Sequence, residues 1–261
     1  MYIKVIISLI ILLCFIGLKV SKQFENINTQ PLYIFWTGGY DSTFRILQAT
    51  IVENRIVIPI YLSGDIDNYE TNKVKRKNKD YELKTIQHIQ EILSTQFPEA
   101  SSNLRPLITI DNLPITKHVD YNMNKLYKKG VISRSRCQYS SISQLALNMN
   151  VPIEVSIEKN NGRLYTALSK RAKGFKENCK ITISSLPPNE SEYKIFKNLR
   201  FPVIHLSKKD MLVYAQKHSY DHILKQTWSC WYPTKKGNPC EKCLMCKERI
   251  VYTDEWRKNN L

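Results

Sequence analysis

The sequence predicts an α/β protein in which a doubly wound, mainly parallel sheet carries a small cysteine-rich region at its C-terminal end. Two observations lead to this fold class. Short apolar runs with strand character alternate with segments of helical periodicity, and four of the seven cysteines stand close together near the end of the chain. With 261 residues and 43% hydrophobic content, the chain is able to bury one large core, which excludes a disordered protein.

The expected strands and helices alternate regularly after a polar linker at 21–30. Helical periodicity is expected over 41–54, 80–93 and 139–149. Ser207 opens a further helix, because Asp210 follows it at capping-box spacing. The expected strands are PLYIFW (31–36), RIVIPIYL (55–62), RPLITID (105–111), VPIEVSI (151–157) and FPVIHL (201–206). This order favours parallel strands with helices on both faces of the sheet.

A glycine loop with the sequence TGGYDST ends the first strand and opens the first helix. Two adjacent glycines indicate backbone positions that a Cβ would obstruct, and amide groups at a helix N-terminus bind anions. Hydroxyl side chains can donate to phosphate oxygens, whereas Asp41 suits a helix cap, as Ser42 does, or a cation such as Mg²⁺. A tight turn is the alternative. We expect phosphate binding, with contacts from Trp36, Thr37, Gly38, Gly39, Tyr40, Asp41, Ser42 and Thr43.

The cysteine-rich region has the pattern C-x9-C-x2-C-x2-C and predicts a metal site. Four thiolates can enclose a tetrahedral Zn²⁺ completely, which makes such a site structural. An iron–sulfur cluster is the main competitor, because three close cysteines and a distant fourth also suit one. Cys137 and Cys179 are isolated, and we expect them to be ordinary thiols, although the basic stretch around Cys137 could lower its pKa. The expected metal ligands are Cys230, Cys240, Cys243 and Cys246.

The N-terminus carries an apolar segment, 5–18, that is uninterrupted by charge and flanked by Lys4 and Lys19. As a helix it would span about 21 Å, short of a hydrocarbon core of about 30 Å unless the lysines extend to the interface. We expect residues 1–24 to form an uncleaved membrane anchor, with the rest of the chain on the cytoplasmic face. A signal peptide and a dispensable extension are the alternatives.

The net charge of +16 does not by itself indicate a nucleic-acid partner. The lysines are scattered, and the densest basic run, 73–79, is typical of a solvated surface. A nucleic-acid partner is therefore not favoured.

The loop and the cysteines together carry a resemblance to a known family. TGGYDST resembles the S-G-G-x-D-S signature of the PP-loop pyrophosphatases, an adenylating superfamily, with Thr37 in place of the first serine. With the cysteine tail in view, the chain resembles 7-cyano-7-deazaguanine synthase, the nitrile-forming enzyme of the queuosine pathway. Its tail has C-x8-C-x2-C-x2-C; here WSC carries the first cysteine, Arg249 follows the last, and one residue is added between the first two. The resemblance covers about 31–252.

The resemblance implies an adenine-nucleotide alpha-hydrolase-like fold and an ATP-dependent carbon–nitrogen ligase that uses ATP, Mg²⁺ and Zn²⁺. The reaction it implies converts 7-carboxy-7-deazaguanine and ammonia to 7-cyano-7-deazaguanine through an adenylated intermediate. It implies catalytic roles for Asp41, Ser42 and Arg134. Two departures bear on the substrate: the family's Pro-x-Arg-Asn segment is here Ile-Ser-Arg-Ser at 132–135, and its Tyr-Pro-Asp-Cys motif is not visible.

We therefore expect three parts: the hydrophobic segment 1–24, a nucleotide-binding α/β domain over 31–226, and a zinc-binding tail over 227–252 packed on it. The expected partners are a small deazapurine substrate and ammonia, and a homodimer stays open. One alternative is a thiolating or amidating PP-loop enzyme that modifies tRNA. Another is a non-catalytic ATP-binding zinc protein.

Overall fold

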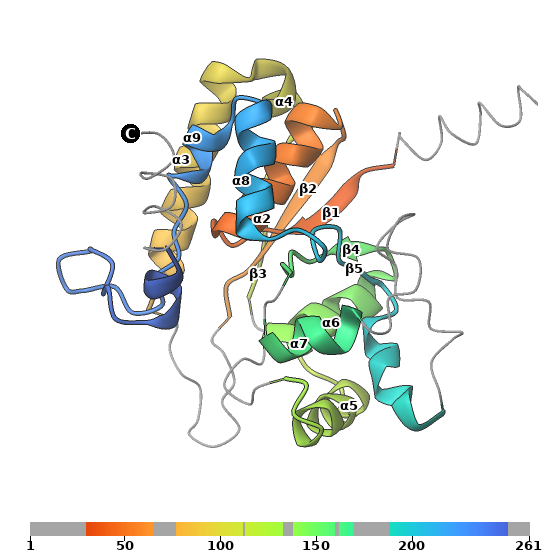
Figure 1. Ribbon diagram of the computed structural model, residues 1–261. Coiled ribbons are helices and arrows are strands. Elements are labelled where there is room, and N and C mark those ends of the chain that lie inside the picture. Colours follow the sequence, from red (N-terminus) through yellow and green to blue (C-terminus); the bar gives the residue numbers. More distant parts are fainter. Residues whose placement is uncertain are drawn as a thin grey trace, which may run out of the picture.

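The computed structural model describes residues 30–64, 77–111, 113–132, 138–159, 162–169 and 188–249. Within these residues a parallel five-stranded sheet forms the centre of the protein, in the order β3-β2-β1-β4-β5 (Figure 1). The order runs outward from β1 in both directions, which confirms the doubly wound α/β fold. The strands are β1 Leu32–Phe35, β2 Val57–Leu62, β3 Ile108–Ile110, β4 Ile153–Glu154 and β5 Leu199–Arg200.

Helices cover both faces of the sheet, as the alternating pattern predicted (Figure 1). One face carries α2 (Tyr40–Leu47), α3 (Lys79–Gln96), α8 (Lys208–Lys217) and α9 (Asp221–Leu224). The opposite face carries α5 (Lys117–Lys128), α6 (Gln138–Met149), α7 (Gly162–Ser169) and the 3₁₀ helix η3 (Pro188–Phe196). The short helix α4 (Pro98–Asn103) follows α3 directly.

Alternation along the strands divides the core between these two faces. Ile34 and Tyr61 are buried under the helices that include α2 and α3, whereas Phe35 and Ile60 are buried on the other side. Successive side chains of a strand point to opposite faces, so a strand that is covered on both sides is apolar throughout. This explains why the strand sequences read as continuous apolar runs.

The helix expected over 41–54 consists of two parts. The α-helix α2 ends at Leu47, and a π-helix, η1 (Gln48–Val52), continues it. Thr50 Oγ1 donates to the Ile46 carbonyl oxygen at 2.9 Å across the junction. The helices expected over 80–93 and 139–149 are confirmed as α3 and α6.

Two of the expected strands are wrong in extent or in place. Residues 201–206 do not form a strand: β5 lies just before them, and the apolar run that follows is a buried turn. Pro202 has no backbone N–H to contribute to a sheet, while Phe201 and Val203 fill the core. In the run 151–157, only Ile153 and Glu154 pair as a strand. Hydrophobicity in these two segments indicates burial rather than strand pairing.

Among the residues that the structure describes, no helix is long and apolar enough to cross a membrane. The apolar segment 5–18, predicted to be an anchor, lies outside the described residues.

Candidate functional site

The glycine loop lies where the strand order of the sheet reverses. β1 has β2 on one side and β4 on the other, and the loop joins the carboxyl end of β1 to α2. Ligands of open parallel sheets bind in the crevice at such a point. The loop also packs closely on α3: a Cβ on Gly38, whose φ is +69°, would lie 2.9 Å from the Glu82 carbonyl oxygen and 3.3 Å from Thr85 Cβ. Only glycine fits at this position.

Hydrogen bonds within the loop draw its hydroxyl groups together. Thr37 Oγ1 and Ser42 Oγ lie 3.3 Å apart, and Ser42 Oγ donates to the Gly39 carbonyl oxygen at 3.2 Å. The side chains of Trp36 and Thr43 are fully buried, and the indole Nε1 donates to Thr43 Oγ1 at 2.9 Å. These two side chains therefore support the loop from the core, whereas Thr37 remains partly exposed.

The structure corrects the expected cap of α2. The helix begins at Tyr40, so its N-cap residue is Gly39, which has no side chain. No side chain therefore caps the helix. Asp41 and Ser42 therefore lie in the first turn. The first hydrogen bond of the helix runs from the Thr43 N–H to the Gly39 carbonyl oxygen at 2.9 Å, so the preceding amides of this turn have no acceptor within the helix. Amides in this position attract anions.

Next to the loop lies a charge cluster formed by Asp41, Glu158, Lys208 and Glu248, of which Glu158 and Lys208 are buried and the other two are partly exposed. Lys208 Nζ lies 2.8 Å from Glu158 Oε1 and 3.3 Å from Glu248 Oε2. Asp41 keeps part of its surface exposed, but its Oδ1 is buried and has no hydrogen-bond partner among the described residues. Burial raises the pKa of Asp41 to about 7; Lys208 opposes this rise, and Glu158 and Glu248 add to it.

This cluster is suited to a divalent cation. The cluster has three carboxylates and one ammonium group, so negative charge is in excess when the acids ionise. Burial raises the pKa of Glu158 as well, although Lys208 opposes the rise. A cation with a preference for oxygen ligands would satisfy the Asp41 oxygen and lower both pKa values. The loop amides beside the cluster suit an anion, so the arrangement can hold a polyphosphate together with its cation.

Glu158, Lys208 and Glu248 were not predicted to be site residues. The sequence around Lys208 did contain a pattern that could have marked it. Lys208 follows Ser207, whose predicted capping box is confirmed at the start of α8. A lysine at the first position of a helix with a capping box is a candidate phosphate ligand. No local pattern marks the two glutamates, because their proximity to Asp41 depends on tertiary structure.

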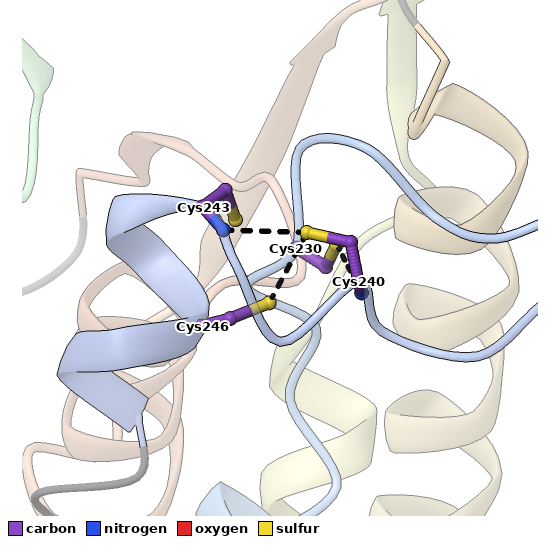
Figure 2. A group of neighbouring side chains, drawn as sticks. All are labelled: Cys230, Cys240, Cys243 and Cys246. Atoms are coloured by element: carbon purple, nitrogen blue, oxygen red, sulfur yellow. Dashed lines mark hydrogen bonds between the residues drawn. The ribbon is translucent and has the colours of Figure 1, made fainter.

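The four predicted metal ligands converge at the C-terminal end of the described chain (Figure 2). Their sulfur atoms all lie within 4.8 Å of one another, and the Cys240 and Cys246 sulfurs are 3.9 Å apart. A Zn–S bond of about 2.3 Å in a tetrahedral site predicts about 3.8 Å between sulfurs. The spacing therefore fits one zinc ion, whereas an iron–sulfur cluster would separate the sulfurs by several intervening atoms.

Backbone amides support thiolate character at this metal site. The Cys240 N–H donates to the Cys230 sulfur at 3.2 Å, and the Cys243 N–H donates to the Cys240 sulfur at 3.4 Å. The amides of Lys242 and Cys243 lower the pKa of Cys240 to about 6, whereas burial raises the pKa of Cys230 and Cys246. A bound zinc ion would deprotonate the buried thiols, since it binds sulfur as thiolate.

Some predicted residues lie outside the described part of the chain. Arg134, a predicted catalytic residue, and Cys137 fall within 133–137, and Cys179 falls within 170–187. Most of the basic run 73–79 is likewise outside it.

Comparison with known proteins supports the resemblance seen in the sequence. The family model described as "Queuosine biosynthesis protein QueC" matches residues 33–254, a range that contains the glycine loop, the charge cluster and all four cysteines of the metal site. A comparison with curated proteins gave no significant match. The family is one of 7-cyano-7-deazaguanine synthesis. The chain therefore belongs to the QueC family of queuosine biosynthesis enzymes.

Proposed function

We infer that the protein converts 7-carboxy-7-deazaguanine and ammonia into 7-cyano-7-deazaguanine through adenylated intermediates, with ATP as co-substrate. Family membership supports the product. The observation that carries the use of ATP is the glycine loop at the switch point of the sheet, with the Asp41 oxygen buried and unpartnered beside it. An anion site next to a cation site is the combination that a magnesium-bound triphosphate requires.

The phosphates of ATP would lie on residues 37–43, where the first-turn amides of α2 and the hydroxyls of Thr37 and Ser42 offer donors. Asp41 and Glu158 would hold Mg²⁺, which neutralises phosphate charge when it is bound. Lys208 would supply a fixed positive charge to the same phosphates. The loop amides and Lys208 would be in place before the reaction, so they would stabilise the charge that develops on phosphate oxygens without having to rearrange.

The reaction that we propose has two activations. A substrate carboxylate oxygen attacks the α-phosphorus of ATP, and pyrophosphate leaves. Ammonia then adds to the acyl carbon, and loss of AMP and a proton gives the amide. The amide oxygen attacks a second ATP in the same way, and loss of AMP and two protons leaves the nitrile. Each of the two carboxylate oxygens therefore leaves on a molecule of AMP.

Arg134 remains our candidate for binding an anionic group of the substrate or of ATP. Arginine can form two parallel hydrogen bonds to a carboxylate or phosphate, which orients the group as well as attracting it. The zinc site has a structural role in this scheme, because its four thiolates leave no position for a substrate.

The test is to incubate the full-length protein with ATP, Mg²⁺, ammonium and 7-carboxy-7-deazaguanine labelled with ¹⁸O in both carboxylate oxygens. We expect mass spectrometry to show the nitrile and AMP that carries one ¹⁸O per molecule. Formation of ADP, or of unlabelled AMP with the nitrile, would show that the oxygens do not leave by adenylation. If ATP binds while the base remains unchanged, the substrate assignment is wrong, and tRNA becomes the next substrate to test.

A matched pair of variants assigns the chemistry to the site. Asp41→Asn should reduce nitrile formation by a factor on the order of 100, the usual effect of removing one preorganised electrostatic group. Glu99→Gln changes an exposed carboxylate at the start of α4 and should leave the rate unchanged. Equal rates for both variants would exclude Asp41 from catalysis.

A further inference from the structure

We propose that Trp228 is a positioning residue, through which the zinc site holds the glycine loop in its phosphate-binding conformation. The inference rests on the phosphate-binding role proposed above and assigns Trp228 and its partner Tyr81 to the machinery of that site. Neither side chain has to touch ATP, because both act through the backbone of the loop.

The first link is a backbone hydrogen bond between the tail and the loop. The Trp228 N–H donates to the Gly38 carbonyl oxygen at 2.9 Å. The Gly38 carbonyl and the Gly39 N–H belong to one planar peptide group, in which they point in opposite directions. Holding the carbonyl therefore aims the Gly39 N–H to the other side, where it donates to Thr37 Oγ1 at 3.4 Å. Trp228 thus orients an amide that in turn positions the Thr37 hydroxyl, one of the groups expected to contact the anion.

The second link is the Trp228 side chain, which stacks on Tyr81 with ring centroids 4.7 Å apart and 16° between the planes. Tyr81 lies in the first turn of α3, next to Glu82, whose carbonyl oxygen faces Gly38. A Cβ on Gly237, in the loop between the first two cysteines, would lie 3.3 Å from the Tyr81 hydroxyl oxygen. The stack therefore joins the cysteine region, α3 and the glycine loop at one point.

The third link connects this segment to the metal ligands. Trp228 Nε1 donates to the Cys230 carbonyl oxygen at 2.8 Å. From the other side, Arg249 donates to the Thr227 carbonyl oxygen at 2.6 Å, and Arg249 follows Cys246 by three residues. A zinc ion bound to the Cys230 and Cys246 sulfurs would join these two hydrogen bonds into one closed circuit of contacts, which includes the backbone of Trp228. Loss of the zinc would open this circuit and release the amide that holds Gly38.

Binding measurements on two pairs of full-length variants test the proposal. Trp228→Ala and Tyr81→Ala remove the stack, whereas Trp228→Phe and Tyr81→Phe keep an aromatic ring. Calorimetry would use magnesium pyrophosphate, which probes the loop, and adenosine, which does not need it. We expect the alanine variants to retain zinc but to bind pyrophosphate about tenfold more weakly, within the range known for residues that couple two sites. Adenosine affinity should stay within about twofold, and the phenylalanine variants should restore most of the pyrophosphate affinity.

The outcomes separate this inference from the proposed function. If the wild type binds neither ATP nor pyrophosphate, the phosphate-binding role fails and the inference fails with it. If the wild type binds pyrophosphate and the alanine variants bind it equally well, the phosphate-binding role stands and the inference is wrong. An equal loss of adenosine and pyrophosphate affinity would indicate general damage and would also contradict a positioning role.

Hydrogen exchange on the unmodified protein provides a second test, which does not depend on the folding of any variant. Removal of zinc by a chelator should accelerate amide exchange in peptides that cover 36–47 and 226–230. A peptide from α5, on the opposite face of the sheet, should exchange at its original rate. Unchanged exchange in 36–47 after zinc removal would overturn the proposal.

Discussion

Asp41 lies in the first turn of α2, where burial raises its pKa to about 7 from an ordinary value of 3.8. Glu158 and Glu248 raise it further, and Lys208 lowers it. A carboxylate with a raised pKa in the folded state favours folding when protonated and opposes it when ionised. The stability of the ligand-free protein should therefore fall as the pH rises from about 4 to about 7.

Asp41→Asn should consequently stabilise the ligand-free protein at pH 8, although it slows nitrile formation by a factor on the order of 100. One pKa unit corresponds to about 1.4 kcal/mol, so the gain is on the order of a few kcal/mol. The difference between variant and wild type should shrink as the pH falls from 8 to 5, because the wild-type carboxyl then becomes neutral. Urea unfolding at pH 8 and at pH 5 measures the difference in unfolding free energy between variant and wild type. A difference that grows toward low pH would contradict the raised pKa of Asp41.

The two glycines of the loop offer a second test at the scale of single residues. Gly38→Ala should lower the free energy of unfolding by about 2 kcal/mol, because its positive φ and the nearby Glu82 carbonyl oxygen oppose a Cβ. Gly39→Ala should cost less than about 1 kcal/mol, because its φ is −77° and its Cβ would meet the Thr37 hydroxyl at 3.2 Å. Thermal unfolding of both variants measures these two losses of stability. Equal losses for Gly38→Ala and Gly39→Ala would contradict the prediction.

At the scale of elements, buried Arg45 joins α2 to β4. Its Nε lies 2.6 Å from Glu154 Oε2, and a second nitrogen lies 2.6 Å from Glu53 Oε1, just beyond the π-helix η1. Removing one partner of a buried ion pair leaves a charge without compensation, which costs more than the pair contributes. The two glutamates differ in exposure, with 12% of the Glu154 side chain accessible and 35% of the Glu53 side chain.

Glu154→Gln should therefore destabilise the protein by about 3 kcal/mol, whereas Glu53→Gln should cost less than about 1 kcal/mol. Chemical denaturation of both variants at neutral pH measures the difference. Similar losses would indicate that solvent screens both pairs to the same degree. Added salt should weaken only the Glu53 contribution.

The helices that the sequence predicted are present in the structure, whereas α4, α5, α7, α9 and η3 were not predicted. The periodic apolar positions of α3, among them Ile86, Ile89 and Leu93, are buried as expected, because one helical face meets the core. The apolar runs at 151–157 and 201–206 are buried too, but only Ile153–Glu154 pairs as a strand. A fully buried strand and a buried turn share the same composition, so hydrophobicity alone does not separate them.

At the scale of the whole molecule, we expect each chain to bind one zinc ion at the four-cysteine site. Cys246→Ser should remove it and lower the thermal midpoint by about 5 °C, because the tail loses the ion that organises it. Cys179→Ser, at a cysteine outside the motif, should retain the zinc and the midpoint. Elemental analysis and thermal unfolding check both variants; iron in place of zinc, or zinc retained by Cys246→Ser, would contradict the assignment.

The fold class, the glycine loop and the cluster of four cysteines were predictable from the sequence, because these depend on local patterns of glycine, cysteine and apolar residues. The sequence did not predict that the charges of Glu158 and Lys208 act on Asp41, or that Trp228 contacts Gly38. These interactions join segments more than a hundred residues apart, and they exist because β4 lies beside β1 and the tail packs on α3. Local patterns carry no information about such neighbours, since the pairing of distant segments depends on how the whole core packs.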